Sequence, residues 1–256
     1  MTNLVQFPGL GLSFELDRVA FSIGGMNIYW YGVCIAVGMC LALVFAFRHS
    51  VEFGVDADAM VDVILIGVVM GILCARLYYV ALSPYQYHSL KDVLAIRDGG
   101  LAIYGGIIGA FLFGGLACKW RKVPVLPMFD LAAMGFLIGQ GIGRWGNFTN
   151  QEAFGTNTTL PWGMWSQKIA DDITSRQAFF ADKGITMDPT MPVHPTFLYE
   201  SISCLLGFVV LYIICRKARK FSGQIALFYG VWYGIERAIV EGLRTDSRYI
   251  AGTTLR

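Results

Sequence analysis

Charged residues are scarce in this sequence. Asp, Glu, Lys and Arg make up 15% of its 256 residues, whereas hydrophobic residues make up 55%. Two long stretches, residues 26–47 and 101–118, contain no charged residue at all. The mean hydropathy of +0.56 is too high for an ordinary soluble domain of this length. The chain therefore belongs to the membrane class.

Several catalytic and metal-binding motifs are also missing. The sequence has no HExxH, P-loop or GxSxG motif, which argues against zinc proteolysis, nucleotide hydrolysis and serine hydrolase chemistry. None of its six cysteines forms a CxxC pair, and all lie in apolar runs, so we interpret them as packing residues. We expect no metal and no cofactor. Residues 1–25 lack a basic start followed by an apolar core, so we expect no cleaved signal peptide.

The apolar segments predict an all-α, polytopic membrane protein. A helix that crosses a bilayer needs about 20 mostly apolar residues, and six segments satisfy this requirement. We expect one integral membrane domain over residues 1–256. The predicted spans cover residues 26–47, 60–82, 101–118, 126–143, 196–215 and 224–243.

The distribution of basic residues predicts the orientation of these spans. Basic side chains gather in alternate loops, which the positive-inside rule assigns to the cytoplasm, so the N-terminus is expected outside. The segment 144–195 is then external, and its tryptophans and prolines suit an interfacial arm. Six spans also leave the C-terminus outside, so we expect a seventh span to be missing from this chain. The basic residues are Arg48, Lys119, Arg121, Lys122, Arg216, Lys217, Arg219 and Lys220.

Glycines recur at short spacing in two of the predicted spans, as in Gly105 and Gly109 and again in Gly135, Gly139 and Gly143. In membranes, small residues at such spacing allow helices to approach closely. We expect most of these glycines to serve helix packing.

A polar cluster follows the fourth predicted span, in GQGIGRWGNFTNQEAFG. It holds Arg144, Asn147, Asn150 and Glu152 among many glycines. Glycines allow a backbone to approach a ligand closely, and Arg and Asn donate to phosphate or carbonyl oxygens. The cluster predicts a phosphate site, and the alternative is an ordinary glycine stop with a basic residue at the helix C-terminus.

A second polar cluster occupies the sixth predicted span. Tyr233, Arg237, Glu241 and Arg244 recur at spacings of four, four and three, which places them on one helical face. Two arginines beside one glutamate leave spare positive charge that a phosphodiester can neutralise. The alternative is an internal ion-pair network that fixes helix packing. Glu236 lies on another face and could be the partner of a neighbouring helix.

Other polar residues have competing interpretations. Tyr104 and Tyr31 lie near the expected outer boundary, where aromatic side chains commonly anchor a span. His194 either acts as an outer acid or base or simply precedes the proline that starts a helix. For Arg76 and Asp62 we favour pairing or snorkelling. Asp130 is expected to cap its helix or pair with Arg121 or Lys122.

Five ordered motifs resemble the bacterial prolipoprotein diacylglyceryl transferases, and the resemblance covers nearly the whole chain. The most specific motif is GRWGNFTNQEAFG. The other four are YWYG, DGGLAIYGGIIG, HPTFLYE and YGIERAIVEGLR. In the order in which they are named here, the five motifs occupy residues 143–155, 29–32, 98–109, 194–200 and 233–244.

The resemblance implies an activity. It implies transfer of the sn-1,2-diacylglyceryl group from phosphatidylglycerol to the lipobox cysteine of a prolipoprotein, with release of sn-glycerol 1-phosphate. The expected location is the bacterial cytoplasmic membrane, and the expected partners are phosphatidylglycerol, prolipoprotein signal peptides and membrane lipids, not nucleic acid. By matching positions, Arg237, Tyr104 and Glu241 are expected to be catalytic. The expected substrate-binding residues are Arg144, Asn147, Glu152, Gly155, Tyr31, Tyr233, Arg244 and His194.

The sequence departs from the family pattern at two places. Many members have a histidine where this chain has Tyr104, so an obligatory imidazole base at that position cannot operate here. Members also continue into a seventh span after the segment that matches residues 244–256. We expect Arg144 and Arg237 to clamp the headgroup while Tyr104 and His194 assist the incoming thiol.

Two other functions compete with this one. A transporter or lipid-binding channel would use the arginines to recognise an anionic solute, but its polar residues should follow a path through both leaflets. A structural membrane subunit would explain the glycines and aromatic residues, but not two arginine clusters.

Overall fold

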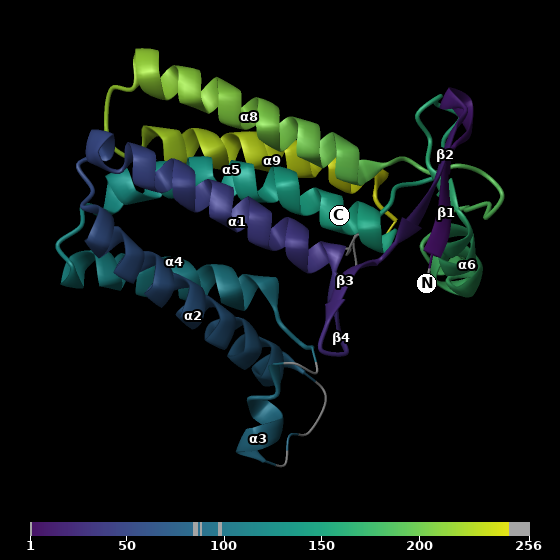
Figure 1. The fold of residues 1–256 in the computed structure, drawn as a ribbon, viewed down its shortest axis with the longest axis horizontal. Helices are drawn as coiled ribbons and strands as arrows, with labels where there is room; N and C mark the ends of the chain where they lie inside the picture. Colours follow the sequence, from purple (N-terminus) through teal and green to yellow (C-terminus); the bar gives the residue numbers. More distant parts are fainter. Residues whose placement is uncertain (1, 84–86, 88, 97–98, 246–256) are drawn as a thin grey trace. The chain divides into compact units, whose positions relative to one another are not determined.

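A computed structural model describes residues 2–83, 87, 89–96 and 99–245 (Figure 1). The chain forms two compact units, one from residues up to 45 together with those from 133 onward, the other from Ala46–Ala132. Asp98, in one of the family motifs, and residues 246–256 lie outside the described residues.

Among the described residues, five helices are long and apolar enough to cross a membrane, and they coincide with five of the six predicted spans. They are α1 (Trp30–His49), α2 (Ala57–Leu82), α4 (Ile103–Trp120), α5 (Val125–Asn150) and α8 (Thr196–Ala218). The sixth predicted span coincides with α9 (Gln224–Leu243), which has 20 residues but carries Glu236, Arg237 and Glu241. Its passage through the membrane stays a prediction.

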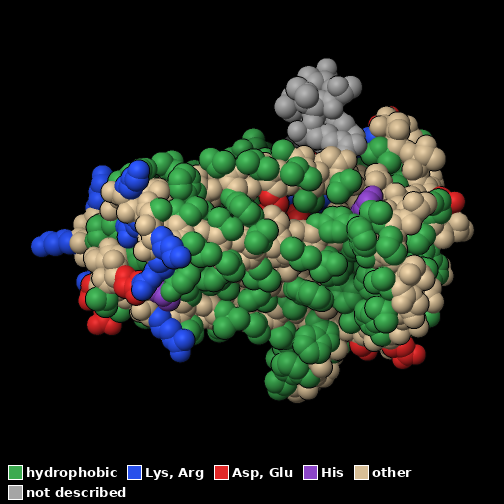
Figure 2. Space-filling model, turned by 90° about the horizontal axis from the view of Figure 1, so that it is seen from above, with side chains coloured by type: hydrophobic (Ala, Val, Ile, Leu, Met, Phe, Trp, Pro, Cys, Tyr) green, Lys and Arg blue, Asp and Glu red, His purple; other side chains and the backbone are tan. Residues whose placement is uncertain are grey.

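The apolar side chains of these helices point largely outward. Leu65 on α2, Ile108 on α4 and Leu206 on α8 are each more than half exposed. Figure 2 shows a face on which hydrophobic side chains predominate. Such a surface is unfavourable in water and suits the hydrocarbon of a bilayer.

Glycines set the close packing of α2 and α4, as the sequence predicted. A Cβ atom built on Gly105 would lie 2.3 Å from Cβ of Tyr78, and one built on Gly109 would lie 2.4 Å from Cβ of Cys74. Any side chain at either glycine would force the two helices apart. In the same unit, Nε of Arg121 lies 2.8 Å from Oδ2 of Asp62, so the pairing expected for Asp62 is confirmed.

In the first unit, α1 packs against α5 through a similar approach. A Cβ on Gly38 would lie 3.1 Å from the carbonyl oxygen of Gly139. Closer to the start of α1, a Cβ on Gly146 would lie 2.7 Å from Cδ2 of Tyr31. The two family motifs YWYG and GRWGN therefore touch each other through this glycine and this ring.

The chain also contains strands, so the expectation of an all-α fold is incomplete. The strand β1 (Thr2–Phe7) pairs antiparallel with β2 (Leu12–Asp17) and with β5 (Trp165–Ser166), in the order β2-β1-β5. A separate hairpin, β3 (Val19–Ile23) with β4 (Met26–Tyr29), leads directly into α1. These strands are short, and β1 and β5 are about 160 residues apart, so no local pattern indicates their pairing.

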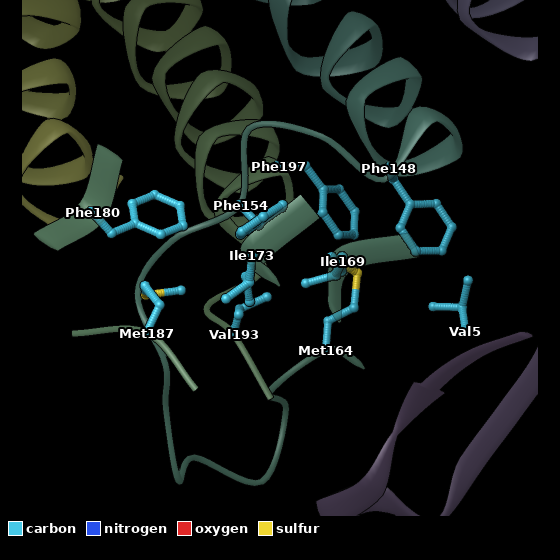
Figure 3. Close-up of a cluster of buried hydrophobic side chains, with 10 residues drawn as sticks. All are labelled: Val5, Phe148, Phe154, Met164, Ile169, Ile173, Phe180, Met187, Val193 and Phe197. Atoms are coloured by element: carbon cyan, nitrogen blue, oxygen red, sulfur yellow. The ribbon is translucent and has the colours of Figure 1, made fainter. Parts of the chain in front are cut away.

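Much of the predicted external arm is folded around a hydrophobic core. The helix α5 continues through Arg144 to Asn150, beyond the predicted end at residue 143. The following chain forms β5, α6 (Gln167–Ser175) and α7 (Gln177–Asp182). Figure 3 shows the core, which joins the N-terminal strand, the end of α5 and the start of α8. Its members are Val5, Phe148, Phe154, Met164, Ile169, Ile173, Phe180, Met187, Val193 and Phe197.

Three short helical segments complete the fold. They are η1 (Pro8–Leu10), η2 (Val51–Phe53) and α3 (Leu90–Val93).

We predict that Gly146→Ala destabilises the protein by roughly 1–3 kcal/mol, because the new methyl group overlaps the Tyr31 ring. The matched control is Gly230→Ala on α9, where the built Cβ meets nothing within 4 Å. This control should leave stability unchanged or slightly raised, since alanine favours helix. Thermal unfolding in detergent measures both. Equal melting temperatures for the two variants would contradict the proposed contact.

Candidate functional site

Three arginines converge on one buried carboxylate. Glu200 lies in the second turn of α8, and its side chain is only 1% exposed. Its Oε1 lies 3.1 Å from Nη2 of Arg144 on α5, 3.1 Å from Nη1 of Arg237 on α9 and 3.8 Å from Nη1 of Arg244 at the end of α9. The structure thus brings together the two arginine clusters that the sequence analysis singled out separately.

A second carboxylate completes this arginine cluster. Arg237 also pairs with Glu241 through Nη2, as the spacing of four residues along α9 allows. The side chains of Arg237 and Glu241 are 30% and 21% exposed, so this pair is less buried than Glu200. The predicted common face for Arg237, Glu241 and Arg244 is therefore consistent with their contacts.

Arg144 retains unused hydrogen-bond donors. A guanidinium has five N–H groups, and within the described part of the chain Arg144 has a single ion-pair partner, Glu200. Its side chain is 19% exposed. Half-buried guanidinium groups with free donors can bind a phosphate oxygen through short, charge-assisted hydrogen bonds.

Asn147 and Glu152, which the sequence predicted to bind substrate, contact each other. Nδ2 of Asn147 donates to Oε1 of Glu152 over 3.1 Å, and Nδ2 of Asn150 donates to the same oxygen over 3.2 Å. Lys168 on α6 donates through Nζ to the carbonyl oxygen of Asn150 at the end of α5. These contacts fix the turn that follows the end of α5.

Gly155 lies where three chain segments meet. Its N–H donates to the carbonyl oxygen of His194 over 3.0 Å, and it forms a bridge with Arg244. Thr156 N–H donates to the carbonyl oxygen of Leu243 over 2.9 Å. A Cβ on Gly155 would lie 2.8 Å from Cβ of His194, so the approach requires glycine.

The aromatic residues of the predicted site have structural partners. The ring of Tyr31 packs on Gly146, two residues after Arg144. The ring of Tyr233 stacks on that of Tyr229, with centroids 5.8 Å apart and planes 14° from parallel. Both tyrosines therefore support helices that carry an arginine of the cluster.

His194 belongs to a short hydrogen-bonded chain. Its Nδ1 lies 3.1 Å from the hydroxyl oxygen of Tyr199, and Nε1 of Trp162 donates to the same hydroxyl over 2.8 Å. Partial burial lowers the pKa of the His194 imidazole below its usual 6.5, because burial disfavours the charged form. The side chain is therefore neutral at pH 7.

Tyr104 lies in the other unit, near the start of α4, and its side chain is 67% exposed. The segment before α4 is held by Arg76, which is buried. Arg76 donates through Nε to the carbonyl oxygen of Val93 over 2.8 Å and through Nη1 to those of Gly99 and Gly100 over 2.6 and 3.1 Å. Arg76 has a structural role, but neither form expected from the sequence is seen: the side chain is buried and does not snorkel, and its described acceptors are backbone carbonyls and not a carboxylate.

The sequence analysis missed the role of Glu200. It noted this glutamate in the motif HPTFLYE but assigned it no partner. A carboxylate inside an apolar helix was the available signal, because such a group needs a cation or donors. Glu236, expected to be a partner for a neighbouring helix, accepts from Sγ of Cys204 on α8 over 3.6 Å.

Comparison with known proteins identifies the family. The family model described as "Prolipoprotein diacylglyceryl transferase" matches residues 18–256. A relative from Finegoldia magna is 41% identical over 92% of this chain and 86% of its own length, and one from Clostridioides difficile is 39% identical over 91% and 85%. A relative from Bacillus cereus strain G9842 is 41% identical over 93% and 84%.

All three relatives are named phosphatidylglycerol–prolipoprotein diacylglyceryl transferase. Phosphatidylglycerol is a membrane lipid, so this name agrees with the five apolar helices among the described residues. The chain is a multi-pass membrane protein, and it belongs to the prolipoprotein diacylglyceryl transferase family.

Proposed function

We propose that this chain transfers the sn-1,2-diacylglyceryl group of phosphatidylglycerol to the thiol of the lipobox cysteine in bacterial prolipoproteins. The other product is sn-glycerol 1-phosphate. The observation that carries the proposal is the convergence of Arg144, Arg237 and Arg244 at Glu200, because it concentrates donors for a phosphodiester beside an apolar surface.

The chemistry explains why arginines suit this site. The sulfur attacks the glyceryl carbon that bears the phosphate ester, so a C–S bond forms while the C–O bond breaks. The electron pair leaves with the phosphate oxygen, and the thiol proton is released. Negative charge therefore grows on the departing phosphate, and fixed cations stabilise that charge without a proton transfer.

The proposal assigns separate roles to the residues of the cluster. Arg144 and Arg237 clamp the phosphate, and Arg244 adds positive charge from the end of α9. Glu200 and Glu241 hold these side chains in place before the lipid binds. The positive field of the same arginines favours the thiolate of the incoming cysteine, whose pKa is about 8.5 when unperturbed.

The remaining residues shape the site or meet the peptide. Tyr31, Tyr233 and Gly155 position the helices and backbone around the arginines. Asn147 and Glu152 fix the turn after α5, the helix that carries Arg144. Tyr104 is proposed to orient the incoming thiol, and its side chain is exposed.

The proposal also includes the topology. The whole chain acts as one membrane domain with six spans in the bacterial cytoplasmic membrane, and the N-terminus and residues 144–195 lie outside. Arg48 and His49 in the last turn of α1, and Arg216 and Lys217 in the last turn of α8, support a cytoplasmic position for those helix ends.

We predict that Arg144→Ala lowers transfer by about 10²–10³-fold, the usual cost of losing a donor to a developing oxyanion. The assay incubates protein in membranes with phosphatidylglycerol and a lipobox peptide, and mass spectrometry follows the gain of mass on cysteine. The matched control is Arg176→Ala, which removes an arginine paired with Asp172 on α6.

The control should transfer at the wild-type rate. Substantial transfer by Arg144→Ala would refute the assigned role. Tight lipid binding by the wild-type protein without any peptide product would favour the transporter or lipid-binding function.

We predict that Glu200→Gln destabilises the protein by about 3 kcal/mol, the low end for breaking a buried ion pair, because the three arginines are partly exposed. Thermal or denaturant unfolding in micelles measures the change. Glu15→Gln, at an exposed position on β2, is the matched control and should change stability little.

Glu200→Gln should destabilise the Arg144→Ala variant by less than it destabilises the wild-type protein, since the two residues share one ion pair. Strictly additive effects of the two substitutions would show that the pair is not coupled.

A further inference from the structure

The hydrogen-bonded chain of Trp162, Tyr199 and His194 favours one of the two imidazole nitrogens as the site of the proton. An indole N–H can only donate, so the hydroxyl oxygen of Tyr199 is the acceptor of the 2.8 Å contact from Trp162. The hydroxyl hydrogen must then point elsewhere. Within the described residues, its available acceptor is Nδ1 of His194 at 3.1 Å.

The opposite arrangement is less favourable. If Nδ1 of His194 carried the hydrogen, the Tyr199 oxygen would accept from both neighbours and its own hydroxyl hydrogen would have no described acceptor. A part-buried donor without an acceptor costs free energy, whereas a continuous chain of donors strengthens each bond. Trp162 therefore sets the direction of the whole chain.

The tautomer of His194 follows from this direction. Its Nδ1 accepts from Tyr199, so the neutral ring carries its hydrogen on Nε2. Burial lowers the pKa of the ring, which keeps it neutral and consistent with an accepting Nδ1. The ring's one lone pair is already occupied by Tyr199, so the free nitrogen can donate but cannot take up a proton.

The position of His194 connects it with the arginine cluster. Its carbonyl oxygen accepts from Gly155, and Gly155 is bridged to Arg244, whose guanidinium lies 3.8 Å from Glu200. Tyr199 precedes Glu200 directly in the chain. His194 is partly exposed, and within the described part of the chain Nε2 has no partner.

We infer that His194 serves the proposed transfer as a fixed hydrogen-bond donor, through Nε2–H, to an oxygen of the phospholipid headgroup, and not as the base that deprotonates the thiol. The inference rests on the proposed function. The donor then adds one hydrogen bond to the phosphate or glycerol oxygens that the arginines bind.

Two amide substitutions distinguish a donor from a base. The side-chain nitrogen of His194→Gln reproduces the place of Nε2, whereas that of His194→Asn reproduces the place of Nδ1, and neither amide is a base. We expect Gln to retain transfer within a few-fold of wild type. Asn should lose about tenfold or more, the cost of a hydrogen bond to a charged acceptor.

The lipid assignment has its own readout. The loss in His194→Asn should appear as a higher KM for phosphatidylglycerol with little change in KM for the lipobox peptide. A change confined to the peptide KM would overturn the assignment to the headgroup. A loss of about 10²–10⁴-fold in kcat for both Gln and Asn would instead identify His194 as a base.

The tautomer can be measured without any activity. The chain has three histidines, so replacing His49 and His88 with Gln leaves one imidazole for ¹⁵N NMR in nanodiscs. We expect a protonated Nε2 and an unprotonated Nδ1, and we expect Tyr199→Phe to mix the two tautomers. Tyr212→Phe, on the same helix, is the control and should leave the imidazole signals unchanged.

A protonated Nδ1 in the wild-type protein would overturn the inference even if transfer is observed. The expected tautomer in a protein that transfers nothing would instead refute the proposed function and leave the hydrogen-bonded chain intact. Thermal unfolding of each variant separates loss of function from loss of fold.

Discussion

The ion pairs at Glu200 are the interaction on which the site depends. One carboxylate oxygen holds arginines from two other helices, and that oxygen is almost fully buried. Guanidinium groups inside an apolar bundle repel one another and are costly to desolvate, so their assembly requires a negative partner at the centre. The carboxylate makes the arrangement stable before any lipid is present, and the outward donors of Arg144 remain available.

A second constraint acts through the backbone. Gly155 donates a main-chain hydrogen bond to His194, just before α8, and Thr156 accepts one from His194. Thr156 also donates to Leu243 at the end of α9. These bonds set the ends of the helices that carry the arginines. In these motifs the charged residues supply the side chains of the site, and the glycines allow the close backbone approach. This explains why glycines and charged residues alternate within the motifs.

The sequence predicted the five apolar helices because long uncharged runs are a strong signal. It also identified Arg144, Arg237, Glu241 and Arg244, because charges inside apolar segments are conspicuous. It could not show that Glu200 joins them, since the three helices meet only in the folded chain. The pairing of β1 with β5 was likewise hidden, because it depends on a distant segment and on the hydrophobic core in Figure 3.

The main-chain hydrogen bonds around Gly155 have a practical consequence. The donors and acceptors of these bonds are backbone groups, so replacing one arginine side chain of the cluster removes none of them. Under the proposed function, a variant without one of these arginines loses transfer while this backbone frame is retained. If the proposal holds, such a variant is a suitable reagent for capturing the bound peptide, because no product forms.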